Sequence, residues 1–345
     1  MKRWLLLQLG RAGLAAWATA SLVFVLSRLL ATGVEEAMLG EATDLQGHFS
    51  ATSTVARQAL RQRLGLEEPV FYVTRSRATA AWHWHGPHNQ YHRWLRGLLH
   101  GQLGWSYRDG QPIGPKLRAA LAYTLPLAVV SAAAALLAAL ALGLALAGGP
   151  ATGWRAGLHL VLTSLQGLPI FALAIGLLFL FANPSGLNIL PAISSADGLS
   201  EPMPGEMALQ LVLPALTLVL ATLPELTLPL AAALRHELRA LYITTARAKG
   251  VPAAAVLRRH ALPNALLPLL TAFAGLLPTL LAGTVLVETV FAVPGVGRLL
   301  AGATATHDYP VVVAGVLLTA GGRLLGLALA DGLYAWADPR IRLAS

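Results

Sequence analysis

The sequence predicts an all-α polytopic membrane protein, and three observations carry this prediction. Of its 345 residues, 56% are hydrophobic and only 12% are charged, with a mean hydropathy of +0.62. This is far more apolar surface than a soluble domain of this size can bury. Long apolar stretches recur along the chain, and in the C-terminal half one long basic stretch, residues 238–263, interrupts them.

The charge balance points to membrane edges rather than to nucleic acid. The net charge is +9, from 25 Lys and Arg against 16 Asp and Glu. Much of it lies in one long loop and beside the apolar stretches, where basic residues are common in membrane proteins. The chain has no Cys, which excludes disulfides, thiolate metal sites and a Cys nucleophile.

Residues 1–31 predict the N-terminus and a first transmembrane helix of about 20 residues, beginning at Ala12. The basic residues Lys2, Arg3 and Arg11 favour a cytoplasmic N-terminus. The segment 18–20, Ala-Thr-Ala, is also typical of a signal-peptide cleavage site. The apolar character continues beyond it, which favours a retained span.

Residues 32–118 are too polar for hydrocarbon and predict an external loop. Segment 89–103 predicts an amphipathic helix with Tyr91, Trp94 and Leu95 toward the membrane surface. Four imidazoles lie within ten residues of this loop, a number that suits Zn, Ni or Cu. The alternative is a solvated loop rich in His and Trp, because no carboxylate or thiolate completes the set. The four candidate ligands are His83, His85, His88 and His92.

Residues 119–345 predict a core of five further helices. The expected spans are 123–147, 158–181, 209–234, 265–287 and 311–335. Three charges fall inside them: Asp331, near the inner end of the last span, and the pair Glu225 and Arg323, which lie at similar expected depths. Because a charge in hydrocarbon is costly, both are candidates for a translocation pathway, where they could pair. The alternatives are a structural hydrogen bond for Glu225, and a snorkelling side chain or a carbonyl contact for Arg323.

The basic stretch 238–263 predicts a helix, a sharp turn and a second helix. Segment 240–249 has helix-forming composition, and Gly250 can close that helix in a left-handed conformation. Pro252 can begin the second helix. Pro263 lacks the backbone donor, so the second helix is expected to end by Leu262. Such a rigid pair between two spans suits contact with a partner protein, although an ordinary basic loop has similar composition.

The pattern of Thr244, Thr245 and Ala246, then Gly250, then a late Leu-Pro resembles the "EAA" coupling loop of ABC importer permeases. It departs at Thr244, where the family has Glu, and at His260, where the family has Ile. The wording TARAKG and RHALPNALLP is similar to the peptide/nickel branch of that family. So are segment 61–113, VETVFAVPGVGRLL at 287–300, HDYP at 307–310 and the DPRIR tail at 338–342. Segment 31–34 and the insertion 74–87 depart from the family pattern.

The resemblance implies a type I ABC importer transmembrane fold with six spans and both termini in the cytoplasm of a bacterial inner membrane. It implies a second permease chain, two ATP-binding subunits that hold ATP and Mg, and an external substrate-binding protein. The cargo would be a dipeptide, an oligopeptide, nickel, a metal chelate or a peptide antibiotic. The residues expected to couple to the ATPase are Thr244, Thr245, Ala246, Arg247, Lys249, Gly250, Leu262 and Pro263.

The motifs of two other classes of protein are missing or incomplete. The chain has no G-x-x-x-x-G-K-[ST] loop, so ATP hydrolysis is expected in a separate subunit. His236 and Glu237 begin an H-E-x-x-H pattern, but Ala240 stands where its second His should be. An enzyme is therefore not expected. An ion-coupled secondary transporter remains an alternative, because intramembrane charges such as Glu225 serve such carriers.

Overall fold

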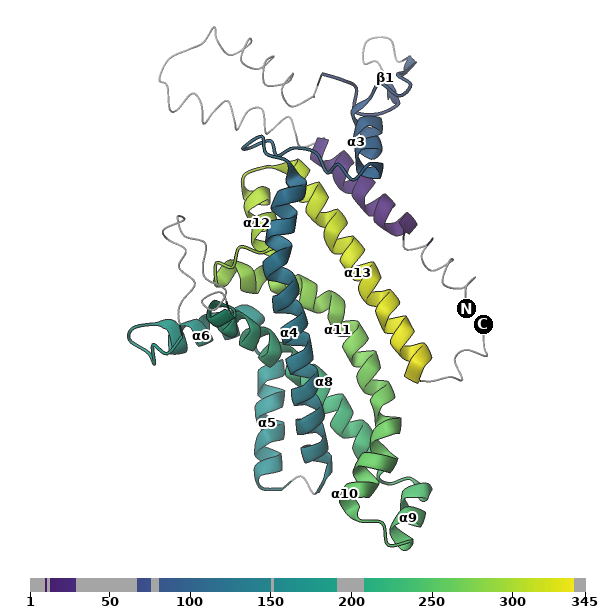
Figure 1. Cartoon of the computed structure of the whole chain (residues 1–345), viewed down its shortest axis with the longest axis vertical. Helices are drawn as coiled ribbons and strands as arrows, with labels where there is room; N and C mark the ends of the chain where they lie inside the picture. Colours follow the sequence, from purple (N-terminus) through teal and green to yellow (C-terminus); the bar gives the residue numbers. More distant parts are fainter. Residues whose placement is uncertain are drawn as a thin grey trace. The chain divides into compact units, whose positions relative to one another are not determined.

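The computed structural model describes residues 10, 13–28, 67–75, 81–149, 152–190 and 208–337. It is mostly helical, and Figure 1 shows its helices in sequence colours. The chain forms two compact units. One contains Ala120–Leu299 and Gly321–Ser345, and the other contains Leu7–Ala119 and Leu300–Ala320.

The first unit is built around α8 (Val212–Glu237), which packs on three other helices. These are α5 (Trp154–Gln166), α6 (Ile170–Ala182) and α11 (Leu262–Val290). The contact face of α8 is a row of buried side chains that includes Leu226, Leu230 and Leu234. The hydrophobic clusters of this unit also include buried residues of α4 (Ile113–Ala147), so α8 lies at the centre of the unit.

Long apolar helices are present where most of the spans were expected. In the part of the chain that the structure describes, Ile113–Ala147, Ala208–Glu237 and Tyr309–Gly326 are long and apolar enough to cross a membrane. The last of these belongs to α13 (Tyr309–Ala337). The first expected span lies partly outside the described residues, within which Gly13–Arg28 is a shorter apolar helix. The count of six spans stays a prediction.

The third expected span is broken in two. Segment 158–181 was expected as one helix with Pro169 inside it, but α5 and α6 meet at an angle of 111°. Pro169 is the N-cap of α6 and has an extended ψ of 140°. Proline cannot donate the hydrogen bond that would continue α5, and it disfavours helical geometry in Leu168 before it. The α5–α6 pair is therefore a broken span or a re-entrant loop.

The second unit contains a short hairpin and the helix α3 (Gln90–Leu99). Strands β1 (Val73–Arg75) and β2 (Trp82–Trp84) pair antiparallel, with Thr74 opposite His83. The expected helix in 89–103 is present as α3, and Asn89 caps it by accepting from the His92 amide at 2.7 Å.

The expected orientation of the α3 aromatic side chains toward the membrane surface was wrong. Tyr91 and Trp94 pack on Phe24 of the helix Gly13–Arg28, with ring centroids at 5.6 and 5.0 Å. Tyr91 is buried, and its hydroxyl forms a hydrogen bond of 2.8 Å with Ser21. An amphipathic helix buries its apolar face against whichever apolar surface is adjacent, and here that surface is another helix.

Candidate functional site: the coupling loop and the external signature

The segment expected to be the coupling loop, residues 238–263, contains α9 (Leu241–Ala248), which ends in a Schellman turn. The Gly250 amide donates to the Arg247 carbonyl at 2.9 Å, and the Val251 amide donates to the Ala246 carbonyl at 3.2 Å. Gly250 has a φ of +77°, a conformation that strains residues with a Cβ. The left-handed turn expected at Gly250 is therefore confirmed.

One face of α9 anchors it to the bundle and the other is exposed. Ile243 and Ala246 are buried in the core cluster that contains Leu234 and Val256. The small side chain of Ala246 lets α9 lie close to this cluster. Six of the expected coupling residues are exposed: Thr244, Thr245, Arg247, Lys249, Gly250 and Pro263.

The expectation that the second helix ends by Leu262 was wrong. After Pro252, α10 (Ala253–Ala255) leads into a π-helix, η1 (Val256–Ala261), and α11 begins directly at Leu262. Pro263 lies in the first turn of α11. The first amides of an α-helix have no i−4 carbonyl partner within the helix, so a proline there costs no hydrogen bond when the preceding turn is not α-helical. A π-turn is such a change, so the helix continues through the proline.

A hydrogen-bonded group that we did not predict joins α8, α9 and α11. The Tyr242 hydroxyl donates to the Glu237 carboxylate, and the Asn264 amide donates to the Tyr242 oxygen at 2.9 Å. Burial, followed by the Glu237 carboxylate, raises the pKa of Tyr242. Glu237 of the incomplete H-E-x-x-H pattern therefore has a structural role, because it accepts the hydrogen bond that ties α9 to the end of α8.

Two arginines bind the C-terminal end of α4, near the coupling loop. Arg235 donates to the Leu146 carbonyl at 3.1 Å, and Arg155 donates to the Ala145 carbonyl at 2.9 Å. The last carbonyls of a helix lack partners and carry partial negative charge, so both contacts are favourable. Leu146 also belongs to the cluster that holds Ile243, which connects α4 to α9 through packed side chains.

The signature VETVFAVPGVGRLL contains a second site that we did not predict. Glu288 at the end of α11 is fully buried, and its carboxylate accepts from the Thr124 hydroxyl at 2.7 Å. It also accepts from the amides of Gly297 at 2.6 Å and Arg298 at 3.2 Å, in the first turn of α12 (Val296–Ala305). A carboxylate at a helix N-terminus satisfies free amides and complements the helix dipole.

The glycines of this signature are explained by the same carboxylate. A Cβ on Gly295 would contact the Glu288 carboxylate, and a Cβ on Gly297 would overlap the Val285 backbone. Side chains at these positions would therefore push the carboxylate from its amide partners. The pattern of glycines around the glutamate was the sequence signal for this site.

A third site in the second unit holds the loop 104–112 to the start of α13. Asp308 of the HDYP segment is buried and accepts from the Ser106 hydroxyl and from the Tyr107 amide, the latter at 2.9 Å. Arg28 donates to the Tyr107 hydroxyl. Burial raises the pKa of Tyr107, and the Arg28 guanidinium opposes this shift.

The four candidate histidine ligands do not form one cluster. The His85 ring bonds to Thr74 at 2.7 Å and the His92 ring bonds to the Tyr72 hydroxyl at 3.0 Å, while His83 and His88 are exposed. Within the described residues, no group of three or more His, Cys, Asp or Glu is arranged to hold a metal ion.

Glu225 on α8 and Arg323 on α13 are both described and both exposed in this single chain. The ion pairs of the described residues do not include one between them. Their role in translocation therefore stays a prediction, and the single chain leaves both side chains open to a neighbouring molecule or to a pathway.

The comparisons with known proteins agree with these features. Residues 139–343, more than half of the chain, match the family described as the binding-protein-dependent transport system inner membrane component. The chain is 35% identical to the di/tripeptide transport system permease protein of Pseudomonas aeruginosa (strain UCBPP-PA14), covering 93% of each chain. It is 34% identical to the oligopeptide transport system permease protein of Bacillus subtilis (strain 168), covering 73% of this chain and 79% of the relative.

A third relative comes from Escherichia coli (strain K12). It bears the name "Probable D,D-dipeptide transport system permease protein" and is 34% identical over 82% of this chain and 83% of its own length. Permeases of this kind lie in the inner membrane and transport rather than catalyse. The chain therefore belongs to the binding-protein-dependent inner-membrane components, as a permease of a peptide-type ABC importer.

Proposed function

We propose that this chain imports di- and oligopeptides by ATP-driven alternating access. The observation that carries this proposal is the construction of the coupling loop. One face of α9 is packed into the bundle core at Ile243 and Ala246, and its other face exposes Thr244, Arg247 and Lys249. A helix that is rigid on one side and free on the other can transmit the displacement of a bound partner.

The force from such a partner would reach the spans by two routes. The first is the group formed by Glu237, Tyr242 and Asn264, which joins α9 to the end of α8 and the start of α11. The second is the continuous path from α10 through η1 into α11. Because α8 and α11 also pack on each other, both routes act on the same pair of helices.

The partners in this proposal are a second permease chain, two ATP-binding subunits and an external substrate-binding protein. Exposed cations on and beside the loop suit an acidic surface of the ATPase, and they are Arg247, Lys249, Arg258 and Arg259. The sequence lacks the phosphate-binding loop that ATP hydrolysis needs, which supports a separate ATPase that binds ATP and Mg.

Peptides are proposed as the cargo because the relatives named above transport dipeptides, di/tripeptides and oligopeptides according to their names. Within the membrane, Glu225 and Arg323 are proposed to line the pathway, where a carboxylate and a guanidinium suit the charged termini of a peptide. The histidines of the hairpin region add no support for nickel, because the rings of His85 and His92 have different partners and His83 and His88 are exposed.

The experiment is uptake of a labelled dipeptide, a longer peptide and nickel in matched cells with and without this chain. A second pair of strains carries an ATPase partner inactivated in its catalytic site. We expect uptake of peptide, but not of nickel, to require both this chain and the active ATPase. Peptide uptake that persists with the inactive ATPase would favour an ion-coupled carrier, and loss of nickel uptake alone would overturn the cargo assignment.

A further inference from the structure

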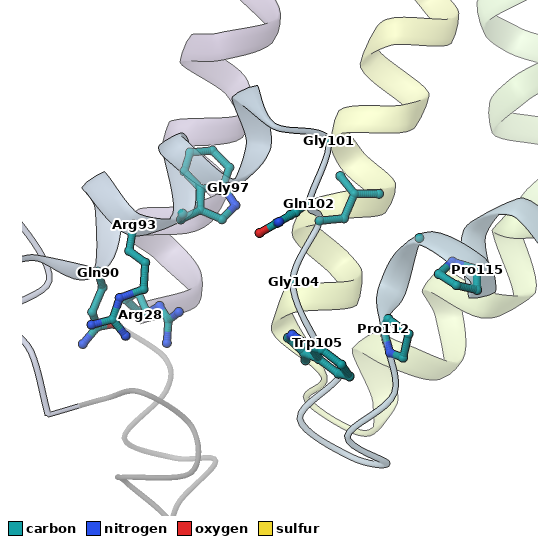
Figure 2. A pocket seen from close by; sticks show the side chains of 13 residues that line it. Arg28, Gln90, Arg93, Gly97, Gly101, Gln102, Gly104, Trp105, Pro112 and Pro115 are labelled. Carbon is teal, nitrogen blue, oxygen red and sulfur yellow. The ribbon is translucent and has the colours of Figure 1, made fainter.

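The second unit contains a pocket of about 600 Å³ that no feature of the transport cycle described above uses. It lies between the end of helix Gly13–Arg28, α3 and the loop that leads to α4. Figure 2 shows Arg28, Gln90 and Arg93 together at one side of the pocket, with Gln102 and Trp105 across from them. All of the lining residues belong to the same unit.

Arg28 brings to this pocket a cation that no carboxylate among the described residues neutralises. One terminal nitrogen of its guanidinium donates to the Tyr107 hydroxyl, while Nε is buried and has no hydrogen-bond partner in the structure. No described carboxylate forms an ion pair with Arg28, whereas Arg93 is paired with Glu68. The Nε edge of a guanidinium presents two parallel N–H donors, the geometry that binds one oxyanion at two points.

Gln90 brings an unsatisfied acceptor to the same pocket. Its side chain is only 6% exposed, and its amide nitrogen donates to the Glu68 carbonyl at 2.6 Å. This bond fixes which end of the amide is the oxygen, and that buried Oε1 has no partner in the structure. Leaving such an acceptor unpaired costs free energy, so a ligand that supplies an N–H group would gain from it.

A ligand that satisfies both groups carries an oxyanion for Arg28 and an N–H donor for Gln90. We propose that the pocket binds the phosphoethanolamine headgroup of a phospholipid, with the phosphate on Arg28 and the ammonium on Gln90 Oε1. A headgroup also suits the surroundings of the site. Arg28 lies on the apolar helix Gly13–Arg28, on which Leu22 and Leu26 are 59% and 47% exposed, and Leu99 of α3 is 79% exposed. Apolar side chains beside an anion site are what an acyl chain requires.

A peptide also carries a carboxylate and N–H groups, so the test separates the two sources. The full-length chain would be placed in nanodiscs containing equal amounts of phosphatidylethanolamine and phosphatidylglycerol, then released for native mass spectrometry. We expect the wild type to retain phosphatidylethanolamine. Arg28→Gln should lower the retained lipid about tenfold, because a charge-assisted bond at two points is lost. Gln90→Leu should remove the preference for phosphatidylethanolamine over phosphatidylglycerol while phospholipid is still retained.

The matched control is Arg96→Gln, which removes an exposed cation from α3 outside the pocket and should retain lipid as the wild type does. If Arg28→Gln fails to fold, Arg28→Lys is used in its place. Lysine keeps the positive charge but lacks the two parallel N–H donors of the guanidinium, so this variant should also retain less lipid than the wild type. Equal retention in the wild type and all pocket variants would overturn the proposal. The proposal would also be overturned if a free dipeptide or inorganic phosphate displaced the lipid at a concentration at which soluble phosphoethanolamine did not.

Discussion

Thr124 on α4 and Glu288 on α11 are 164 residues apart in the sequence and joined by a hydrogen bond of 2.7 Å between two buried side chains. The same Thr124 oxygen accepts from the Val296 amide at 2.8 Å, at the start of α12. One threonine hydroxyl therefore connects two apolar helices and the first turn of a third.

Thr124→Val should lower the free energy of unfolding by about 1–3 kcal/mol, because the buried carboxylate and the Val296 amide each lose a partner while the side-chain volume is kept. The measurement is the thermal unfolding midpoint in nanodiscs. Thr163→Val is the matched control, since the exposed Thr163 hydroxyl bonds only within α5. Equal midpoints for both variants would contradict a stabilising role for Thr124.

Gly297→Ala should destabilise the protein more than Gly302→Ala, although both glycines belong to α12. A Cβ at position 297 would overlap the Val285 backbone and press on the Glu288 carboxylate, while position 302 faces open space. In the open position, Ala should stabilise the helix by about 0.5–1 kcal/mol. The yield of folded protein and its unfolding midpoint test this, and the same change in both variants would speak against the clash.

Gly250→Val should reduce peptide uptake per ATP hydrolysed. A β-branched residue at a φ of +77° is strained by about 1–2 kcal/mol or more, so the turn after α9 would open. Gly157→Val is the control, because Gly157 lies on α5 in open space without a positive φ. Normal uptake and normal ATPase assembly in Gly250→Val would refute the role of this turn.

Tyr242→Phe should loosen α9 without unfolding the bundle. The variant loses the bonds to Glu237 and Asn264, about 1 kcal/mol in net stability, which corresponds to roughly fivefold faster amide exchange in α9. Hydrogen exchange of the coupling loop measures this directly. Tyr309→Phe on α13 serves as the control, and protection of α9 that matches the wild type would show that the group does not hold the loop.

Acid should weaken the structure of the loop 104–112 through Asp109. A hydrogen bond from Lys116 lowers the pKa of Asp109 to about 2, below the value of about 3.9 for a free Asp. Because the folded pKa is the lower one, the stabilisation is complete above the unfolded pKa and is lost as the pH falls to about 2. The effect should be small, since the Asp109 side chain is 41% exposed.

Amide exchange in this loop, followed from neutral pH to acid, checks the prediction. Asp109→Asn should remove this part of the pH dependence, because it cannot ionise. If the amide protection of the loop falls with acid to the same extent in the wild type and in Asp109→Asn, Asp109 is not the titrating group.

Local features of the fold were predictable because they follow from backbone chemistry. Gly250 permits a left-handed residue that few other side chains tolerate, so its turn could be inferred from one letter. The family resemblance was also readable, because its motifs are contiguous segments. In contrast, the rule that proline ends a helix failed at Pro263, since a π-turn before it rearranged the hydrogen bonds on which the rule depends.

The contacts that were missed are those between residues far apart in sequence. Nothing near Thr124 indicates a buried carboxylate 164 residues away, and nothing near Phe24 indicates that Tyr91 will pack on it. The apolar face of α3 could be predicted from residue spacing, but the surface that this face meets could not, because tertiary packing determines it. Only the glycines around Glu288 carried a signal of their site.

The six π-helical residues of η1 set the rotational phase of α11. A π-turn accommodates more residues per turn than an α-turn, so an α-helical path through the same segment would rotate every later side chain about the helix axis, by about 100° for each residue of difference. Glu288, at the far end of α11, would then point away from Thr124. A change at the α9–α10 loop that rewound η1 would therefore reach the Glu288 end of α11 as a twist of the helix rather than as a displacement along it.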